Sequence, residues 1–353
     1  MTYYDEQNGG FRREEQNGAV YHTGNGFYRP YAEPLWKKEK RKIRGAGNGI
    51  GLASLGYIGF SFAAGALLSV FINLIYPLSN IHGLLYMTET AEWTFTLIIY
   101  ALSLLVPFGL YALFTKMPLK VALPFRRAKV DLTVGGVCIG LGASIIASYA
   151  TGYLQVALEA VGIGITMPEY EIPETVPGLI LYVITLTVAP AFVEEIVFRG
   201  IVMQNLRRFG DIFALVSSAL IFGIFHLNLI QMPYAFIMGL CIGYFVMRTG
   251  SIWVGIIIHF INNGVAVVFE FALENAAEKT YMIANLAYNL VCVILAVIAL
   301  AVILTKYTDM FRFERSRTVL SPGKKTLYFL TSPAIIIAMI AAVCLTLPYI
   351  YLI

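Results

Sequence analysis

Charged residues are scarce in this chain of 353 residues, because only 13% are Asp, Glu, Lys or Arg while 58% are hydrophobic. Soluble domains usually carry about 25% charged residues, so this composition excludes an ordinary soluble globule. The apolar residues form long runs without alternation, which excludes a transmembrane barrel, since barrel strands alternate between lipid and lumen. The sequence therefore predicts an all-α, polytopic membrane helical bundle.

Cysteine is also rare, and its four copies show neither disulfide nor metal-ligand spacing; they are Cys138, Cys241, Cys292 and Cys344. The chain contains no phosphate-binding glycine loop and no His-Glu-x-x-His helix. The glycines between Gly135 and Gly142 predict close helix packing rather than nucleotide binding. The first 45 residues lack the apolar core of a signal peptide. We interpret 1–45 as a disordered, basic cytoplasmic tail and 46–353 as the membrane domain.

About eight to nine segments are apolar and long enough to cross a bilayer as helices, which takes roughly 20 residues. The segment Tyr234–Met247 is short and follows Pro233, which indicates a helix sheltered by its neighbours. The predicted spans are Asn48–Tyr76, Trp93–Thr115, Leu132–Tyr153, Leu179–Asn205, Ile212–Leu229, Tyr234–Met247, Ile252–Leu273, Met282–Leu304 and Thr326–Tyr351.

The distribution of Lys and Arg predicts the orientation, because cytoplasmic loops carry the excess of positive charge. With a cytoplasmic N-terminus, all 25 basic residues except Arg199 and Lys279 fall on the cytoplasmic side. The basic run from Lys37 to Arg44 is then a topology signal that also contacts anionic lipid. We expect an integral membrane protein, in the plasma membrane if the cell is prokaryotic.

Three ionisable residues interrupt one predicted span: Glu194, Glu195 and Arg199. A charge in the middle of a membrane costs at least about 2.5–3.5 kcal/mol, so such groups usually face one another or a wet cavity. Residues four apart share a helix face, so Arg199 is expected to neutralise Glu195. Glu194 is rotated about 100° away from that pair and is left free to act.

Two further polar pairs follow on later predicted helices. Phe222 and His226 are four residues apart, and so are His259 and Asn263. Gly255 lies on the same helix line as His259 and leaves room for another group to approach. Taken singly, a membrane histidine is more often an interhelical hydrogen-bonding group than a catalyst, and Asn263 alone is typical of helix packing.

A depth estimate indicates whether these groups can meet. In an unbroken hairpin around the turn Arg207–Gly210, Glu194 and His226 both lie roughly 21–23 Å from the turn. His259 lies only roughly 13 Å from its own turn at Gly250. The three meet if the first hairpin protrudes about 8–10 Å into the cytoplasm. The site is then expected in the cytoplasmic half of the bilayer.

The ordered set Glu-Glu-x-x-x-Arg, Phe-x-x-x-His and His-x-x-x-Asn on separate membrane helices resembles the CPBP family of CAAX-protease and bacteriocin-processing intramembrane endopeptidases. Each pair alone is weak evidence, but the ordered set is specific. The resemblance covers about Leu179–Leu273, which we take as the catalytic core. It implies hydrolysis of a peptide bond inside the membrane.

The resemblance implies roles that suit the chemistry. Glu194, assisted by His226, is expected to hold and deprotonate the attacking water, because a desolvated carboxylate is a better base than a solvated one. His259 and Asn263 are expected to donate hydrogen bonds to the oxyanion. The orienting group is expected to consist of Glu195, Arg199 and Phe222.

No cofactor is favoured, but a zinc-dependent version of the protease uses the same atoms. Two histidines and a glutamate form a known catalytic zinc set, which here is Glu194, His226 and His259. The sequence does not separate the two versions, because these residues come from three helices without the local spacing of a zinc motif.

Two other classes use intramembrane polar residues: proton-coupled transporters and non-catalytic bacteriocin-immunity proteins. A transporter more often shows repeated halves, and this chain shows no repeat. Degeneration of the polar signature, which is intact here, is expected of a non-catalytic protein. The expected partners are the lipid bilayer and a membrane-associated, prenylated or amphipathic peptide, not nucleic acid. The oligomeric state is left open.

Overall fold

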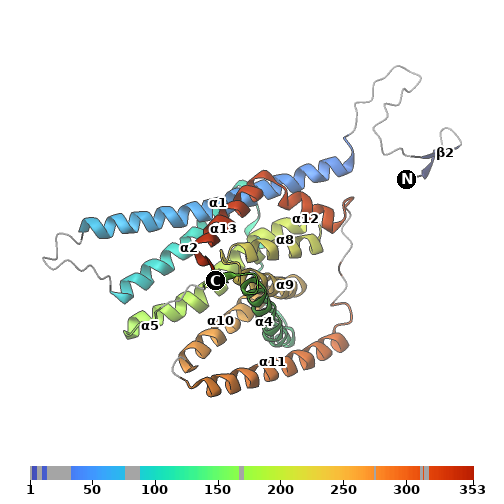
Figure 1. The fold of residues 1–353 in the computed structure, drawn as a ribbon. Helices are drawn as coiled ribbons and strands as arrows, with labels where there is room; N and C mark the ends of the chain where they lie inside the picture. Colours follow the sequence, from blue (N-terminus) through green and yellow to red (C-terminus); the bar gives the residue numbers. More distant parts are fainter. Residues whose placement is uncertain are drawn as a thin grey trace.

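The computed structural model describes residues 2–5, 10–13, 33–75, 88–166, 171–273, 276–310, 313 and 318–353. It is built almost entirely of helices, which confirms the predicted all-α membrane bundle (Figure 1). Much of the predicted tail over 1–45 lies outside the described residues, as do His22 and His82, and helix α1 already begins at Leu35.

The longer helices are α1 (Leu35–Ile75), α2 (Glu89–Phe114), α4 (Val130–Glu159), α8 (Asp211–Ile224), α9 (Gln231–Thr249), α10 (Ile252–Leu273), α11 (Glu278–Lys306) and α13 (Pro333–Thr346). The shorter ones are α3 (Leu119–Ala122), α5 (Val176–Val183), α6 (Ala189–Glu194), α7 (Met203–Arg207), α12 (Pro322–Leu330) and the 3-10 turn η4 (Leu347–Tyr349). Two small antiparallel pairs join β1 (Thr2–Asp5) to β2 (Gly10–Arg13) and β3 (Ile163–Ile165) to β4 (Ile350–Leu352).

The number of membrane-spanning helices agrees with the prediction of about eight to nine. Within the described residues, seven helices are long and apolar enough to cross a membrane, and α12 with α13 makes an eighth if that pair, bent by 69°, is one span. The predicted straight span Thr326–Tyr351 is therefore two helices. The predicted span Ile212–Leu229 is also wrong, because α8 has only 14 residues and is too short to cross.

Helix α8 ends at Ile224, before the predicted end of the span, because the residues after it favour a turn. Leu227 adopts a left-handed conformation with φ of 50°. The side-chain oxygen of Asn228 then accepts hydrogen bonds from the backbone nitrogens of Ile230 and Gln231, which starts α9. His226 therefore lies in the turn that follows α8, not within a helix.

The segment from Val176 to Arg207 is one long composite helix with two π-helical stretches, η2 (Ile184–Val188) and η3 (Glu195–Val202). Thr175 caps its first turn by accepting a hydrogen bond from the Gly178 nitrogen. Pro190 has no N–H to donate to the Leu186 carbonyl four residues earlier, so it disturbs the regular helix there. π-helical bulges are frequent at functional sites, and both stretches carry or contact the polar residues described below.

Helices α1 and α11 lie along opposite sides of the bundle, and α4, α5, α8, α9 and α10 lie between them (Figure 1). Helix α4 packs against α9, α10 and α11. The glycines of α4 allow this close contact, because a Cβ at Gly142 would lie 2.4 Å from the Cβ of Ala296. The predicted role of these glycines in helix packing is confirmed.

The contact between α1 and α13 yields a stability prediction. A Cβ at Gly51 would lie 2.4 Å from the carbonyl carbon of Ala334 and 2.5 Å from the nitrogen of Ile335, and backbone atoms cannot rotate away. Overpacking of this kind costs about 1–3 kcal/mol, so Gly51→Ala should lower the thermal unfolding midpoint in detergent by at least about 2 °C. Gly65→Ala on the same helix is the control, because no atom lies within 4 Å of its Cβ position. Equal midpoints for the two variants would contradict this packing.

Candidate functional site

A buried ion pair lies at the centre of the polar residues. A guanidinium nitrogen of Arg199, Nη1, lies 3.0 Å from Oε1 of Glu195, and the two side chains are 1% and 0% exposed. The guanidinium carbon of Arg199 also lies 4.0 Å from the centre of the Phe222 ring, a cation–π contact. Both charges are therefore compensated inside the bundle, where an unpaired charge costs several kcal/mol.

His259 extends this ion pair toward Glu194. Its Nδ1 lies 2.9 Å from Oε1 of Glu195, and because an ionised carboxylate only accepts, Nδ1 carries the hydrogen. Gly255, one turn earlier on α10, gives the carboxylate room, since a Cβ there would lie 2.9 Å from Oε2 of Glu195. Glu195 thus fixes the orientation of the imidazole, and the other ring nitrogen, Nε2, faces Glu194.

Glu194 is the last residue of α6 and has one engaged and one open carboxylate oxygen. The hydroxyl of Tyr100, from α2, donates a hydrogen bond to Oε1 at 2.7 Å. Oε2 is buried without a hydrogen-bond partner among the described residues, and it lies 3.7 Å from Nε2 of His259. That separation is longer than a direct hydrogen bond. Polar atoms at such a separation are often bridged by a water molecule.

His226 joins the site through Phe222. Its Nδ1 lies 2.9 Å from the Phe222 carbonyl oxygen, and since a carbonyl only accepts, Nδ1 donates and Nε2 is left as an acceptor. The rings of His226 and Phe222 meet edge to face at 4.9 Å, and Phe222 also lies 6.1 Å from the ring of His259. Neither a hydrogen bond nor an ion pair joins His226 to Glu194, both of which are described.

Asn263 contacts the composite helix where Pro190 disturbs it. Its amide nitrogen donates to the Leu186 carbonyl at 3.2 Å, the carbonyl that Pro190 cannot serve. Its oxygen accepts a hydrogen bond from Asn262 at 3.3 Å, and Asn262 in turn accepts one from Tyr234. Asn263 is thus held by two neighbours rather than directly by His259.

The structure brings Glu194, Glu195, Arg199 and His259 into one contact network and adds Phe222 beside it. Tyr100 belongs to this network and was missed by the sequence analysis. It is one of 22 tyrosines and lies in an apolar span 94 residues before Glu194. Nothing in its sequence surroundings distinguishes it, so only the fold identifies it.

The residues of the zinc alternative are not arranged as a set of three ligands. No group of three His, Cys, Asp or Glu side chains in the described part of the chain is placed to hold a metal ion. Nδ1 of His259 contacts Glu195, which leaves Nε2 as the ligand atom of that histidine, but His226 is not within ion-pair distance of Glu194. The arrangement therefore does not fit zinc coordination by Glu194, His226 and His259.

Comparison with known proteins gives one finding. Residues 176–265 match the family model described as type II CAAX prenyl endopeptidase, Rce1-like. The matched segment contains every residue of the polar signature, and it lies within the predicted core Leu179–Leu273 except for three residues at its start. A search of curated proteins and a search of solved structures give no match. The match supports a peptidase over the transport and non-catalytic alternatives.

The buried pair yields a second stability prediction. Arg199→Met leaves the buried Glu195 carboxylate without its strongest partner, and breaking such a pair costs about 3–5 kcal/mol. The thermal unfolding midpoint should therefore fall sharply, and the double variant Glu195→Gln with Arg199→Met should recover at least half of the loss. Asp211→Asn is the control, because the pair of Asp211 with Arg207 has the same spacing but is partly exposed. Equal losses for Arg199→Met and Asp211→Asn would contradict the assigned importance of the buried pair.

Proposed function

Because the chain is a membrane peptidase that carries a domain of the Rce1-like type II CAAX prenyl endopeptidase family, we propose that Glu194 is the general base in the hydrolysis of a peptide bond. The bond belongs to a membrane-associated peptide. One observation carries this assignment: Oε2 of Glu194 is buried, has no hydrogen-bond partner among the described residues and faces Nε2 of His259. A base needs an open oxygen of this kind to receive a proton.

In the proposed reaction, Glu194 takes a proton from water while the water oxygen bonds to the scissile carbonyl carbon. The proton then passes to the leaving amide nitrogen as the carbon–nitrogen bond breaks, which regenerates the carboxylate. Tyr100 holds Oε1 and so directs Oε2 toward the water. His226 assists as an acceptor, since its Nε2 is the ring nitrogen left without the hydrogen.

His259 and Asn263 are proposed to stabilise the oxyanion. Nδ1 of His259 is held by Glu195, so Nε2 is the ring nitrogen that faces the reacting atoms. As Glu194 takes the proton, the negative charge moves from its carboxylate to the oxyanion. Asn263 donates one amide hydrogen to Leu186 and has a second available. Deleting one such donor typically costs about 2.7–4 kcal/mol.

We propose that the reaction needs no metal. The lack of a three-ligand group among the described residues supports this version over zinc. All steps above are therefore assigned to the side chains themselves.

The proposed substrate is a lipid-tethered or amphipathic peptide that reaches a site in the cytoplasmic half of the bilayer, with the N-terminus of the enzyme cytoplasmic. The basic ends of several helices support this orientation because they lie together. Lys42 of α1 and Arg208 after α7 line the same groove, and Lys325 of α12 donates to the Phe209 carbonyl. One shared basic face is expected of the cytoplasmic side.

The first test of function is Glu194→Gln in purified protein in nanodiscs, with a farnesylated peptide and the same peptide without its lipid as substrates. Cleavage should fall at least about 100-fold, because a general base contributes about 10²–10⁴-fold. A zinc chelator should leave wild-type cleavage unchanged. Glu270→Gln is the matched control, since Glu270 is another glutamate of the membrane region and accepts a hydrogen bond from Tyr182 away from the site.

Two results would contradict the proposal, and a third would remove its support. Full activity in Glu194→Gln would remove its role as base. Chelator-sensitive cleavage that added zinc restores would establish the zinc version. An equal loss in Glu270→Gln would show that any change of an intramembrane glutamate damages the fold, so that the loss in Glu194→Gln says nothing about the base.

A second test addresses the positioning of His259 by Glu195. Gly255→Ala places a Cβ 2.6 Å from Cγ2 of Val246 and 2.9 Å from Oε2 of Glu195, so both side chains must shift, and the imidazole of His259 moves with the carboxylate. We expect kcat to fall about 10–100-fold with little change in KM, because a displacement near 1 Å can cost about 100-fold. Gly264→Ala on the same helix is the control, since nothing lies within 4 Å of its Cβ position. Unchanged kcat in Gly255→Ala would show that Glu195 does not position His259.

A further inference from the structure

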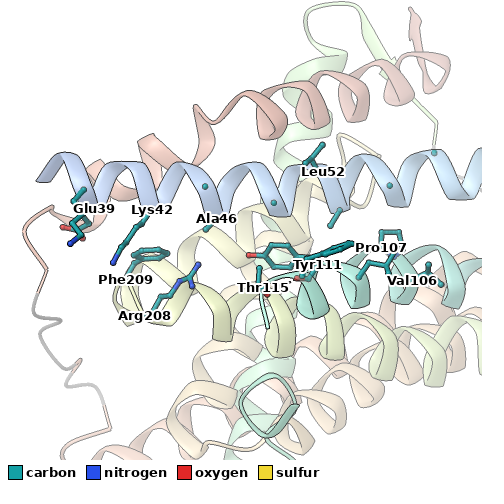
Figure 2. A pocket seen from close by; sticks show the side chains of 18 of the residues that line it. Glu39, Lys42, Ala46, Leu52, Val106, Pro107, Tyr111, Thr115, Arg208 and Phe209 are labelled. Atoms are coloured by element: carbon teal, nitrogen blue, oxygen red, sulfur yellow. Dashed lines mark hydrogen bonds between the residues drawn. The ribbon is translucent and has the colours of Figure 1, made fainter. Parts of the chain in front are cut away.

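A large groove lies between α1 and α2, at a distance along the chain from the signature residues. Its volume is about 1460 Å³, which exceeds the roughly 300–1,000 Å³ of ordinary small-molecule pockets. Figure 2 shows its walls, with α1 above and Pro107 and Tyr111 of α2 below. The groove contains none of the residues assigned to catalysis, so it calls for a separate explanation.

One end of the groove is positively charged. Lys38, Lys42 and Arg208 line it, all three are exposed, and none forms an ion pair with an acidic side chain among the described residues. Figure 2 shows Lys42 and Arg208 at the same end of the groove, near Phe209. Three uncompensated cations at one end favour an anionic group there.

The acidic residue at this end does not offset the three cations. Glu39 lines the groove, but its Oε1 lies 3.6 Å from Nζ of the buried Lys325. Its other oxygen accepts hydrogen bonds from the backbone nitrogens of Val319 and Leu320. The Glu39 charge is thus balanced by a lysine that belongs to the fold.

The rest of the groove is apolar and open. From Ala46 to Ala63, the lining of α1 extends about 26 Å, longer than the roughly 15 Å that one leaflet of the hydrocarbon core provides. Leu52, Leu110 and Phe114 line it and are exposed, as expected of side chains that face lipid tails. A charged end followed by a long apolar channel is the outline of a phospholipid.

The glycines of α1 create the space. At Gly49 and Gly56 the helix touches α2, because a Cβ would lie 2.6 Å from the Tyr111 ring and 3.0 Å from Pro107. At Gly45 and Gly59, which also line the groove, no atom lies within 4 Å of the Cβ position. The two helices therefore meet at some glycines and leave the channel open at others.

We propose that this groove binds one anionic phospholipid, with its phosphate at Lys42 and Arg208 and an acyl chain along the glycine face of α1. Charge complementarity selects the headgroup, and the apolar length accommodates the chain. The proposal is independent of the catalytic assignment, because it uses none of the residues of that site.

The test is native mass spectrometry of the full-length protein released from nanodiscs that contain equal amounts of phosphatidylglycerol and phosphatidylcholine. Wild type should retain one phosphatidylglycerol in preference to phosphatidylcholine. Each cation near an anionic headgroup contributes about fivefold, so the double variant Lys42→Ala with Arg208→Ala should weaken retention about 30-fold. Lys37→Ala is the control, since Lys37 belongs to the same basic run but does not line the groove.

A second pair of variants tests the channel rather than the charge. Gly59→Leu fills open space in the groove and should abolish retention of the lipid, whereas Gly65→Leu adds the same side chain at an open position outside the groove and should not. Both replace a helical glycine by a better helix former, so neither is expected to unfold α1. Thermal unfolding midpoints of the four variants check this.

Five results would overturn the proposal. Retention unchanged in both the charge and the filling variants would show that no lipid binds here. Loss with the charge variant but not with Gly59→Leu would assign binding to the surface alone. Competition by inorganic phosphate would indicate a phosphate site without a lipid. Displacement of the lipid by the farnesylated peptide would show that the groove binds the substrate. A dimer without lipid would show that the groove binds a second copy of the chain.

Discussion

The contact between Arg199 and Glu195 is the interaction on which the site depends. It pairs the charge of a buried carboxylate in an apolar bundle, and that carboxylate in turn fixes the ring of His259. His259 then faces the open oxygen of Glu194. Because Phe222 covers the guanidinium, the same contact joins α8 to the composite helix. The chemistry and the packing therefore share one pair of charges, and neither Arg199 nor Glu195 can change alone without loss to both.

Much of the fold was readable from the sequence because long apolar runs have few alternatives in a membrane. The helix bundle and the approximate number of spans followed from run length alone. The two wrong spans, Ile212–Leu229 and Thr326–Tyr351, are those in which a few residues end one helix and start the next. After α8, the Asn228 side chain accepts hydrogen bonds from the backbone of the turn that leads into α9, and Ser332 with Pro333 separates α12 from α13. Hydropathy averages over such residues and therefore misses these breaks.

The residues of the site were more predictable than the contacts between them. Spacing placed Arg199 beside Glu195, and Gly255 next to an approaching group, and the structure has both contacts. The partners across helices were not predictable, because they depend on rotation and tilt. Thus Glu194 faces His259, while Tyr100 comes from α2, where its apolar neighbours in the sequence do not mark it as a site residue. Asn263 donates to the Leu186 carbonyl, which Pro190 cannot serve, and spacing does not reveal this link between distant residues.

The early end of α8 has a consequence for the supply of water, the second reactant of hydrolysis. Residues 225–230 form non-helical backbone between two helices of the bundle, and such backbone is tolerated at membrane depth only where protein buries it or a water-filled cavity borders it. Asn228 and Ile230 are buried, whereas His226 and Leu227 are partly exposed. The turn thus contains both buried residues and partly exposed ones, with His226 and Leu227 among the latter. A hydrolase surrounded by lipid needs a path by which water reaches its site. The partly exposed part of this turn, at His226 and Leu227, is the place in the fold suited to that path.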